Sequence, residues 1–166
     1  PLLQGVINRT KAVFAGRRGA VVTLAGMGGA HGVHLPSAGL PVAEVRRRYP
    51  PPFLIVRSCH GLREVPAAAG EGADAVVLGP VFETPSKAAY GSPLGLNALR
   101  EACAASPVPV IGLGGIDGRN GREVLEAGAA GLAAIRLFCC MERPLTEVPD
   151  LRKRLSRPDE GAGGAR

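Results

Sequence analysis

The sequence predicts an α/β fold built on a parallel sheet, and two observations lead to this prediction. Short, wholly apolar segments, such as residues 53–56 and 75–78, alternate along the chain with longer amphipathic segments. Apolar runs without polar alternation are typical of strands buried on both faces, as in a parallel sheet covered by helices. Polar residues or glycines follow six of these runs, at the strand ends where such sheets bind ligands. Six such ends around one ring favour a closed barrel over an open, doubly wound sheet.

Composition limits the class of protein further. The 166 residues suffice for one domain, and no apolar run approaches the length of a membrane span. The start, Pro1-Leu2-Leu3-Gln4, has neither an initiator Met nor a signal-peptide pattern, so we expect a soluble, cytoplasmic protein whose beginning is missing. The net charge is +6, but aromatic residues make up only 4%, too few to stack nucleic-acid bases. The four cysteines lack the spacing of a zinc site or a disulfide framework.

The expected elements follow one another regularly, except in one ambiguous segment. We expect strands at residues 5–9, 32–35, 53–56, 75–78, 107–113 and 132–135, and helices at 40–49, 61–70, 94–104, 120–127 and 150–155. Within residues 10–30, the run 20–25 could be a strand or one side of a helix, and a glycine cluster breaks it. Residues 1–145 form the expected barrel domain, and residues 146–166 form a terminal helix and a disordered tail.

The most informative loop follows the apolar run 75–78. Thr84 and Ser86 offer hydroxyls, Pro85 stiffens the turn and Lys87 adds a cation. Hydroxyls and an ammonium just past the carboxyl end of a buried strand suit an anionic ligand, phosphate above all. The alternative is a polar loop that merely joins a strand to a helix.

Other strand ends carry further candidates. They are Asn8, His34, Ser58 with His60, Gly114 with Gly115, and Arg136. His60 could be a general acid–base or could orient a loop by hydrogen bonding. We expect His34 to be a packed strand residue, His31 a loop residue, and Cys59 a buried thiol near the site.

Four motifs, taken in this order, resemble the thiamine phosphate synthase and TenI superfamily. They are Gly32-Val33-His34-Leu35, Ser58-Cys59-His60, the run from Gly79 to Lys87 that ends in Thr84-Pro85-Ser86-Lys87, and Gly112-Leu113-Gly114-Gly115-Ile116. The resemblance covers residues 5–138. It implies a TIM-type (β/α)8 barrel that acts on thiazole phosphate and pyrimidine pyrophosphate, here N-terminally truncated with about six strand–helix units present.

The resemblance also implies roles for individual residues. Ser58, Lys87 and His60 would form the catalytic set, with Lys87 stabilising the charge that builds on the leaving pyrophosphate. The substrate-binding residues would be Asn8, Thr84, Ser86, Gly114, Gly115, Ile135 and Arg136. The two glycines would bring bare backbone N–H groups against the thiazole phosphate, at the same end of the sheet as Lys87.

Three positions depart from the family's pattern. The superfamily implies Mg²⁺, but Arg9 and Gly39 stand where its metal-binding Asp residues are expected, so its usual ligands are not found. Arg136 replaces a Ser in the last phosphate turn and either binds phosphate or is solvated. Because strand number and tilt are linked in a barrel, six strands predict an incompletely closed barrel with exposed edges.

Two classes of function therefore remain open. The first is a transferase that joins hydroxymethylpyrimidine pyrophosphate to thiazole phosphate and releases pyrophosphate. A TenI-like thiazole tautomerase ranks lower within this class, because the loop Thr84-Pro85-Ser86-Lys87 looks more like the synthase. The second is a non-catalytic member that keeps the phosphate site. The expected partners are small phosphorylated heterocycles, with no nucleic acid or membrane, and a homo-oligomer is open.

Overall fold

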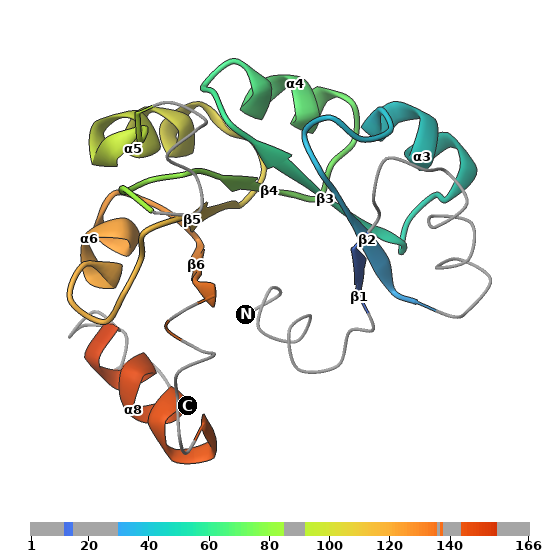
Figure 1. Cartoon of the computed structure of the whole chain (residues 1–166). Helices are drawn as coiled ribbons and strands as arrows, with labels where there is room; N and C mark the ends of the chain where they lie inside the picture. Colours follow the sequence, from blue (N-terminus) through green and yellow to red (C-terminus); the bar gives the residue numbers. More distant parts are fainter. Residues whose placement is uncertain (1–11, 15–29, 85–91, 136, 138–143, 156–166) are drawn as a thin grey trace, which may run out of the picture.

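A six-stranded parallel sheet forms the centre of the molecule. The computed structural model describes residues 12–14, 30–84, 92–135, 137 and 144–155 (Figure 1). Each strand pairs with the next in the chain, so that the sheet follows the sequence order β1 (Ala12–Phe14), β2 (Gly32–Leu35), β3 (Leu54–Cys59), β4 (Ala75–Leu78), β5 (Val110–Leu113) and β6 (Gly131–Ala133).

Helices cover one face of this sheet. Figure 1 shows the strands along an arc, with helices on its outer side and α8 beyond the end of the arc, beside α6. The helices are α3 (Val42–Arg48), α4 (Glu64–Gly70), α5 (Gly95–Ala105), α6 (Gly121–Glu126) and α8 (Pro144–Leu155). The alternation of parallel strands with covering helices confirms the predicted α/β class.

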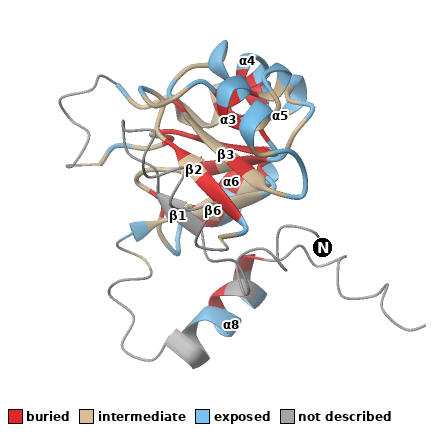
Figure 2. Ribbon diagram, turned by 90° about the vertical axis from the view of Figure 1, so that its right-hand side faces the viewer, coloured by how far each residue is buried: buried red, intermediate tan, exposed pale blue. Residues whose placement is uncertain are grey.

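The hydrophobic core lies between the sheet and the helices. Side chains alternate between the faces of a strand, and alternate residues such as Val33, Leu35 and Ile55 belong to the buried cluster that the helices join through Val65 and Leu99. Figure 2 shows the buried residues on the strands and on the helix sides that face them, with exposed residues on the outer helix surfaces. The intervening strand residues, which include His34, Val56 and Ser58, therefore face the opposite side of the sheet.

Most elements lie where the sequence predicts them. The main differences are that β3 extends beyond residue 56 through Cys59, that β5 begins at Val110 rather than at residue 107, and that α8 begins at Pro144 rather than at residue 150. Apolarity alone ended the expected strand at residue 56, whereas parallel pairing with β4 carries it through Ser58 and Cys59. Proline is well tolerated in the first turn of a helix, where its missing N–H has no helical partner.

Strand β1 was not predicted. It lies within residues 10–30, and its length of three residues is too short to show a hydrophobic period. The expected first strand at residues 5–9, the ambiguous run 20–25 and the tail 161–166 lie outside the described residues. Among the described strands, β1 and β6 are the two ends of the sheet and do not pair with each other.

None of the helices in the described part of the chain is long and apolar enough to cross a membrane.

Candidate functional site

The carboxyl ends of all six strands lie at one edge of the sheet because the strands are parallel. Two predicted candidates meet near this edge. Nε2 of His34, on β2, lies 2.8 Å from Oγ of Ser58, on β3, and both side chains are partly buried. Burial lowers the pKa of His34 below 6.5, so that the imidazole is neutral near pH 7. His34 is thus a strand residue with a specific polar partner, beyond the packing role that the sequence suggests.

His60 connects the ends of β3 and β4. Its Nδ1 lies 2.6 Å from the carbonyl oxygen of Gly79, and its backbone N–H donates to Glu64 over 3.1 Å. A carbonyl oxygen only accepts, so Nδ1 carries the proton and a neutral ring keeps its lone pair on Nε2. Of the two roles that the sequence leaves open for His60, orientation of a loop has a geometric basis here. The residue as a whole is exposed.

The glycine turn after β5 packs tightly against the loop after β4. The backbone N–H groups of Val81 and Phe82 donate to the carbonyls of Leu113 and Gly114, over 2.9 and 3.0 Å. Gly114 and Gly115 have φ values of +99° and +66°. A Cβ on Gly115 would lie 2.5 Å from the carbonyl oxygen of Glu83, so only glycine fits this turn.

The loop after β4 is described continuously as far as Thr84, and up to that point it lies against the glycine turn after β5. Glu83, against which Gly115 packs, is the residue before Thr84, so this hydroxyl-bearing residue follows directly on the contact with the glycine turn. The predicted residues Lys87, Ser86, Asn8 and Arg136 lie outside the described residues. Ile135 follows β6 and is 75% exposed, and the hydrogen bonds of the described residues do not join it to the other candidates.

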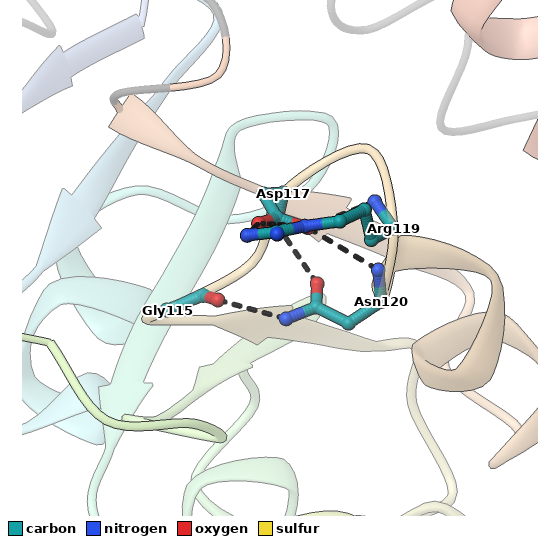
Figure 3. Close-up of polar contacts among 4 residues, drawn as sticks. All are labelled: Gly115, Asp117, Arg119 and Asn120. Atoms are coloured by element: carbon teal, nitrogen blue, oxygen red, sulfur yellow. Dashed lines mark hydrogen bonds and ion pairs between the residues drawn. The ribbon is translucent and has the colours of Figure 1, made fainter.

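A polar turn after the glycines was not predicted as part of the site (Figure 3). Nδ2 of Asn120 donates to the carbonyl of Gly115 over 3.0 Å, and Oδ1 of Asn120 accepts the backbone N–H of Asp117 over 2.8 Å. The carboxylate of Asp117 accepts hydrogen bonds from the side chain and backbone of Arg119. These bonds lower the pKa of Asp117 to about 2. The spacing Asp117-x-x-Asn120 is visible in the sequence, but it also suits an ordinary helix start.

Arg57 holds the loop after β2 from the neighbouring strand. Its two terminal nitrogens donate to the carbonyls of Ser37 and Leu40, each over 2.7 Å. Gly39, at a position where the superfamily implies a metal-binding Asp, lies in this loop, and its backbone N–H donates to Pro36 over 2.7 Å. The loop is therefore fixed by a cation on β3, a role that the sequence analysis did not assign to Arg57.

The described residues do not fit a Mg²⁺ site by themselves. Among them, no three His, Cys, Asp or Glu side chains are grouped so that they could hold a metal ion. The carboxylates of Glu64 and Asp117 near the sheet edge already accept hydrogen bonds from His60 and Arg119. Cys59 is not a ready metal ligand, because burial above all raises the pKa of its thiol to about 11.

The fold and the site define an α/β protein with a parallel sheet that gathers polar side chains and a glycine turn at the carboxyl ends of its strands. This is where proteins of the class bind phosphorylated ligands. The profile of the family described as thiamine monophosphate synthase matches residues 20–138, and the chain belongs to this family.

Curated relatives are similar over most of this chain. It is 39% identical over 125 residues to the thiamine-phosphate synthase of Albidiferax ferrireducens, covering 75% of this chain and 57% of the relative. It is 48% identical over 107 residues to the thiamine-phosphate synthase of Methanoculleus marisnigri, covering 64% of this chain and 51% of the relative. The chain thus spans about half the length of these relatives.

Solved structures share the fold. The thiamine phosphate pyrophosphorylase of Pyrococcus furiosus has a TM-score of 0.75 and 29% identity, covering 93% of this chain and 71% of that structure. A nitroalkane oxidase of Streptomyces ansochromogenes has a TM-score of 0.56 and 26% identity, covering 69% of this chain and 36% of that structure. Since the fold is shared with a different enzyme, function must be argued from the site.

Proposed function

We propose that this chain carries the thiamine-phosphate synthase reaction, in which hydroxymethylpyrimidine pyrophosphate and thiazole phosphate give thiamine phosphate and pyrophosphate. The observation that carries the proposal is the packing of the Gly114–Gly115 turn against the loop that leads to Thr84. The family match over residues 20–138 supports the choice of substrates.

The chemistry is a substitution at the pyrimidine methylene carbon. The carbon–oxygen bond breaks, its electron pair leaves with pyrophosphate, and the lone pair of the thiazole nitrogen forms the new carbon–nitrogen bond. Negative charge builds on the leaving oxygen, and Lys87 would stabilise this charge. The hydroxyls of Ser58, Thr84 and Ser86 would hold the phosphoryl oxygens.

His34 and His60 would support these groups. If Nε2–H of His34 donates to Oγ of Ser58, the hydroxyl proton of Ser58 is directed to another acceptor, such as a phosphoryl oxygen. His60 keeps the ends of β3 and β4 together, and its Nε2 would serve as the general acid–base of the proposed reaction. Asn8, Ile135 and Arg136 complete the proposed substrate contacts. Gly114 and Gly115 would offer backbone N–H groups to the thiazole phosphate.

The family resemblance implies Mg²⁺ for this reaction, but the described residues do not supply a set of metal ligands. The proposed substitution is therefore assigned to side chains and backbone groups of this chain alone. This mismatch favours one alternative, a non-catalytic member that binds the phosphorylated heterocycles without joining them. A TenI-like thiazole tautomerase is a second alternative within the family, with no observation of its own in its favour.

The remaining expectations form part of the same proposal. The six described strands would belong to a TIM-type (β/α)8 barrel, with about six strand–helix units in this chain. The partners would be the two small heterocycles, in the cytoplasm, without nucleic acid or a membrane, and a homo-oligomer remains open. Residues 1–145 would form the barrel domain and residues 146–166 the terminal segment.

Pyrophosphate release tests the proposal. The purified chain is mixed with hydroxymethylpyrimidine pyrophosphate and thiazole phosphate, with and without added Mg²⁺, and both pyrophosphate and thiamine phosphate are quantified. We expect equal amounts of the two products. We also expect a loss of about 100-fold or more in rate for Lys87→Ala, since such electrostatic groups contribute on this scale. Asn97→Ala, on the exposed side of α5, serves as the control. Binding of thiazole phosphate without any product would favour the non-catalytic alternative.

A further inference from the structure

Hydrogen bonds to the carbonyl groups fix the orientation of the peptide groups in the turn after β5. The carbonyls of Leu113 and Gly114 accept the N–H groups of Val81 and Phe82 in the loop after β4. In a trans peptide, the C=O and N–H groups of one peptide unit point in opposite directions. The N–H groups of Gly114 and Gly115 therefore point away from the loop after β4.

The third peptide of the turn is controlled by Asn120. The carbonyl of Gly115 accepts a hydrogen bond from Nδ2 of Asn120 over 3.0 Å, as Figure 3 shows. By the same geometry, the N–H group of Ile116 points away from Asn120. The side chain of Asn120 is itself held in place, because its Oδ1 accepts the backbone N–H of Asp117 over 2.8 Å. One side chain thus sets the rotation of the Gly115–Ile116 peptide.

This use of Asn120 is not what its position in the sequence would suggest. Asn120 occupies the N-cap position of α6, where asparagine commonly accepts a hydrogen bond from the backbone of the first helical turn. In the described structure its side chain makes no such bond to the helix. Its Nδ2 is directed to the carbonyl of Gly115 and its Oδ1 to the backbone N–H of Asp117, both of which precede the helix. The bonds of Asn120 therefore serve the turn rather than the helix start.

A second pair of residues fixes the backbone on which Asn120 stands. The carboxylate of Asp117 accepts the backbone N–H groups of Arg119 and Asn120, over 2.8 and 3.3 Å. Nη2 of Arg119 lies 2.8 Å from the same carboxylate and balances its charge. The segment from Asp117 to Asn120 is thus a hydrogen-bonded turn, and it holds the glycine turn through the bond from Asn120 to the carbonyl of Gly115.

We propose that Asn120 is a positioning residue that holds the Gly115–Ile116 peptide in the orientation required to bind the phosphate of thiazole phosphate. This inference rests on the proposed function, because it assigns the glycine turn to that ligand. Asn120 acts through the backbone and does not itself touch the ligand. Without its hydrogen bond, the peptide can rotate and its N–H group is no longer directed at a fixed point.

Binding measurements on two neutral variants test this role. Asn120→Ala and Asn120→Leu remove both hydrogen bonds without adding a charge that would itself repel phosphate. Asn97→Ala is the matched control, since Asn97 is an exposed asparagine on α5 whose side-chain oxygen accepts a hydrogen bond from Arg100. The dissociation constants of the full chain for thiazole phosphate and for hydroxymethylpyrimidine pyrophosphate are measured separately by calorimetry.

We expect both Asn120 variants to weaken thiazole phosphate binding about tenfold, as loss of one charge-assisted hydrogen bond would do. Affinity for the pyrimidine pyrophosphate should change by less than about twofold. The amide NMR signal of Ile116 should also shift in the variants and not in Asn97→Ala. A merely structural role would weaken both ligands alike, and that outcome overturns the proposal. Unchanged thiazole phosphate affinity overturns it as well. If the wild-type chain binds no thiazole phosphate, the proposed function falls and this role falls with it.

Discussion

Nε2 of His34 lies 2.8 Å from Oγ of Ser58, although the two residues are 24 positions apart and on different strands. The register of β2 and β3 explains the contact, because His34 is paired with Val56 and Ser58 is the next residue of β3 on the same face. The neutral imidazole and the hydroxyl can therefore satisfy each other within the partly buried sheet face. This pairing makes the stability of the sheet sensitive to pH.

The first prediction concerns this pH dependence. Burial lowers the pKa of His34 below its unfolded value of 6.5, so the unfolded chain binds the proton more readily than the folded chain. The stabilisation from the neutral ring is complete above about pH 6.5 and is lost as the pH falls through the lower folded pKa. The free energy of unfolding is measured with urea between about pH 5 and pH 8. As the pH is lowered, we expect it to fall less steeply in His34→Gln than in the wild-type chain. Parallel curves for the two proteins would contradict this.

The second prediction concerns the pair Asp117 and Arg119. The side-chain hydrogen bond from Arg119, followed by its backbone N–H, lowers the pKa of Asp117 to about 2 from 3.8. In Arg119→Ala, the pKa of Asp117 should rise toward 3.8, as measured by NMR titration of its carboxyl carbon. The stability linked to Asp117 is present above about pH 4 and is lost as the pH falls toward 2. Arg100→Ala is the control, because Arg100 lies on α5 and bonds Asn97 rather than Asp117. It should leave the pKa of Asp117 unchanged.

The third prediction concerns the shape of the glycine turn. Gly115→Ala should destabilise the chain by roughly 1–2 kcal/mol from the left-handed backbone alone, with a further cost from the clash with Glu83. Gly70→Ala is the matched control, because a Cβ there meets nothing within 4 Å. Gly70 ends helix α4, and alanine there should stabilise by about 0.5 kcal/mol. Chemical unfolding gives both values. Equal effects of the two substitutions would show that the turn tolerates a side chain.

These residues also indicate how far the sequence predicts the molecule. The buried strands are predictable because a short, continuous apolar run such as residues 75–78 is typical of a strand that is covered on both faces. The glycine turn is predictable because only glycine adopts positive φ without cost, and two adjacent glycines after a strand are a local feature. Local chemistry was sufficient in both cases.

Features that depend on pairing between distant segments were not predictable. The contact of His34 with Ser58 requires the register of two strands, and a single sequence does not contain that information. Asn120 is a different case. From the sequence it is only the first residue of the expected helix 120–127, and only the three-dimensional structure shows its side chain directed to Gly115. Strand β1 is too short to have a period at all.

The fourth prediction concerns Arg46, at the end of the sheet opposite the candidate site. Its guanidinium donates to the carbonyls of Gly72, Phe53 and Tyr49, and Nη2 lies 2.5 Å from Asp74. Asp74 in turn accepts the backbone N–H of Ile55 over 2.6 Å, so Arg46 joins the segments that lead into β3 and β4. These contacts stand at the amino ends of the strands, where they should affect stability and not ligand binding.

Arg46→Met keeps the apolar stem of the side chain and removes all of these hydrogen bonds. Because the side chain is only 17% exposed, water cannot fully replace the lost donors, and we expect a loss of roughly 2 kcal/mol in the free energy of unfolding. Arg48→Met, on the exposed side of the same helix, should change stability by less than about 0.5 kcal/mol. Affinity for thiazole phosphate should be the same in both variants under conditions where both are folded. A weaker affinity in Arg46→Met alone would mean that the two ends of the sheet are coupled, contrary to the division between a stabilising end and a binding end.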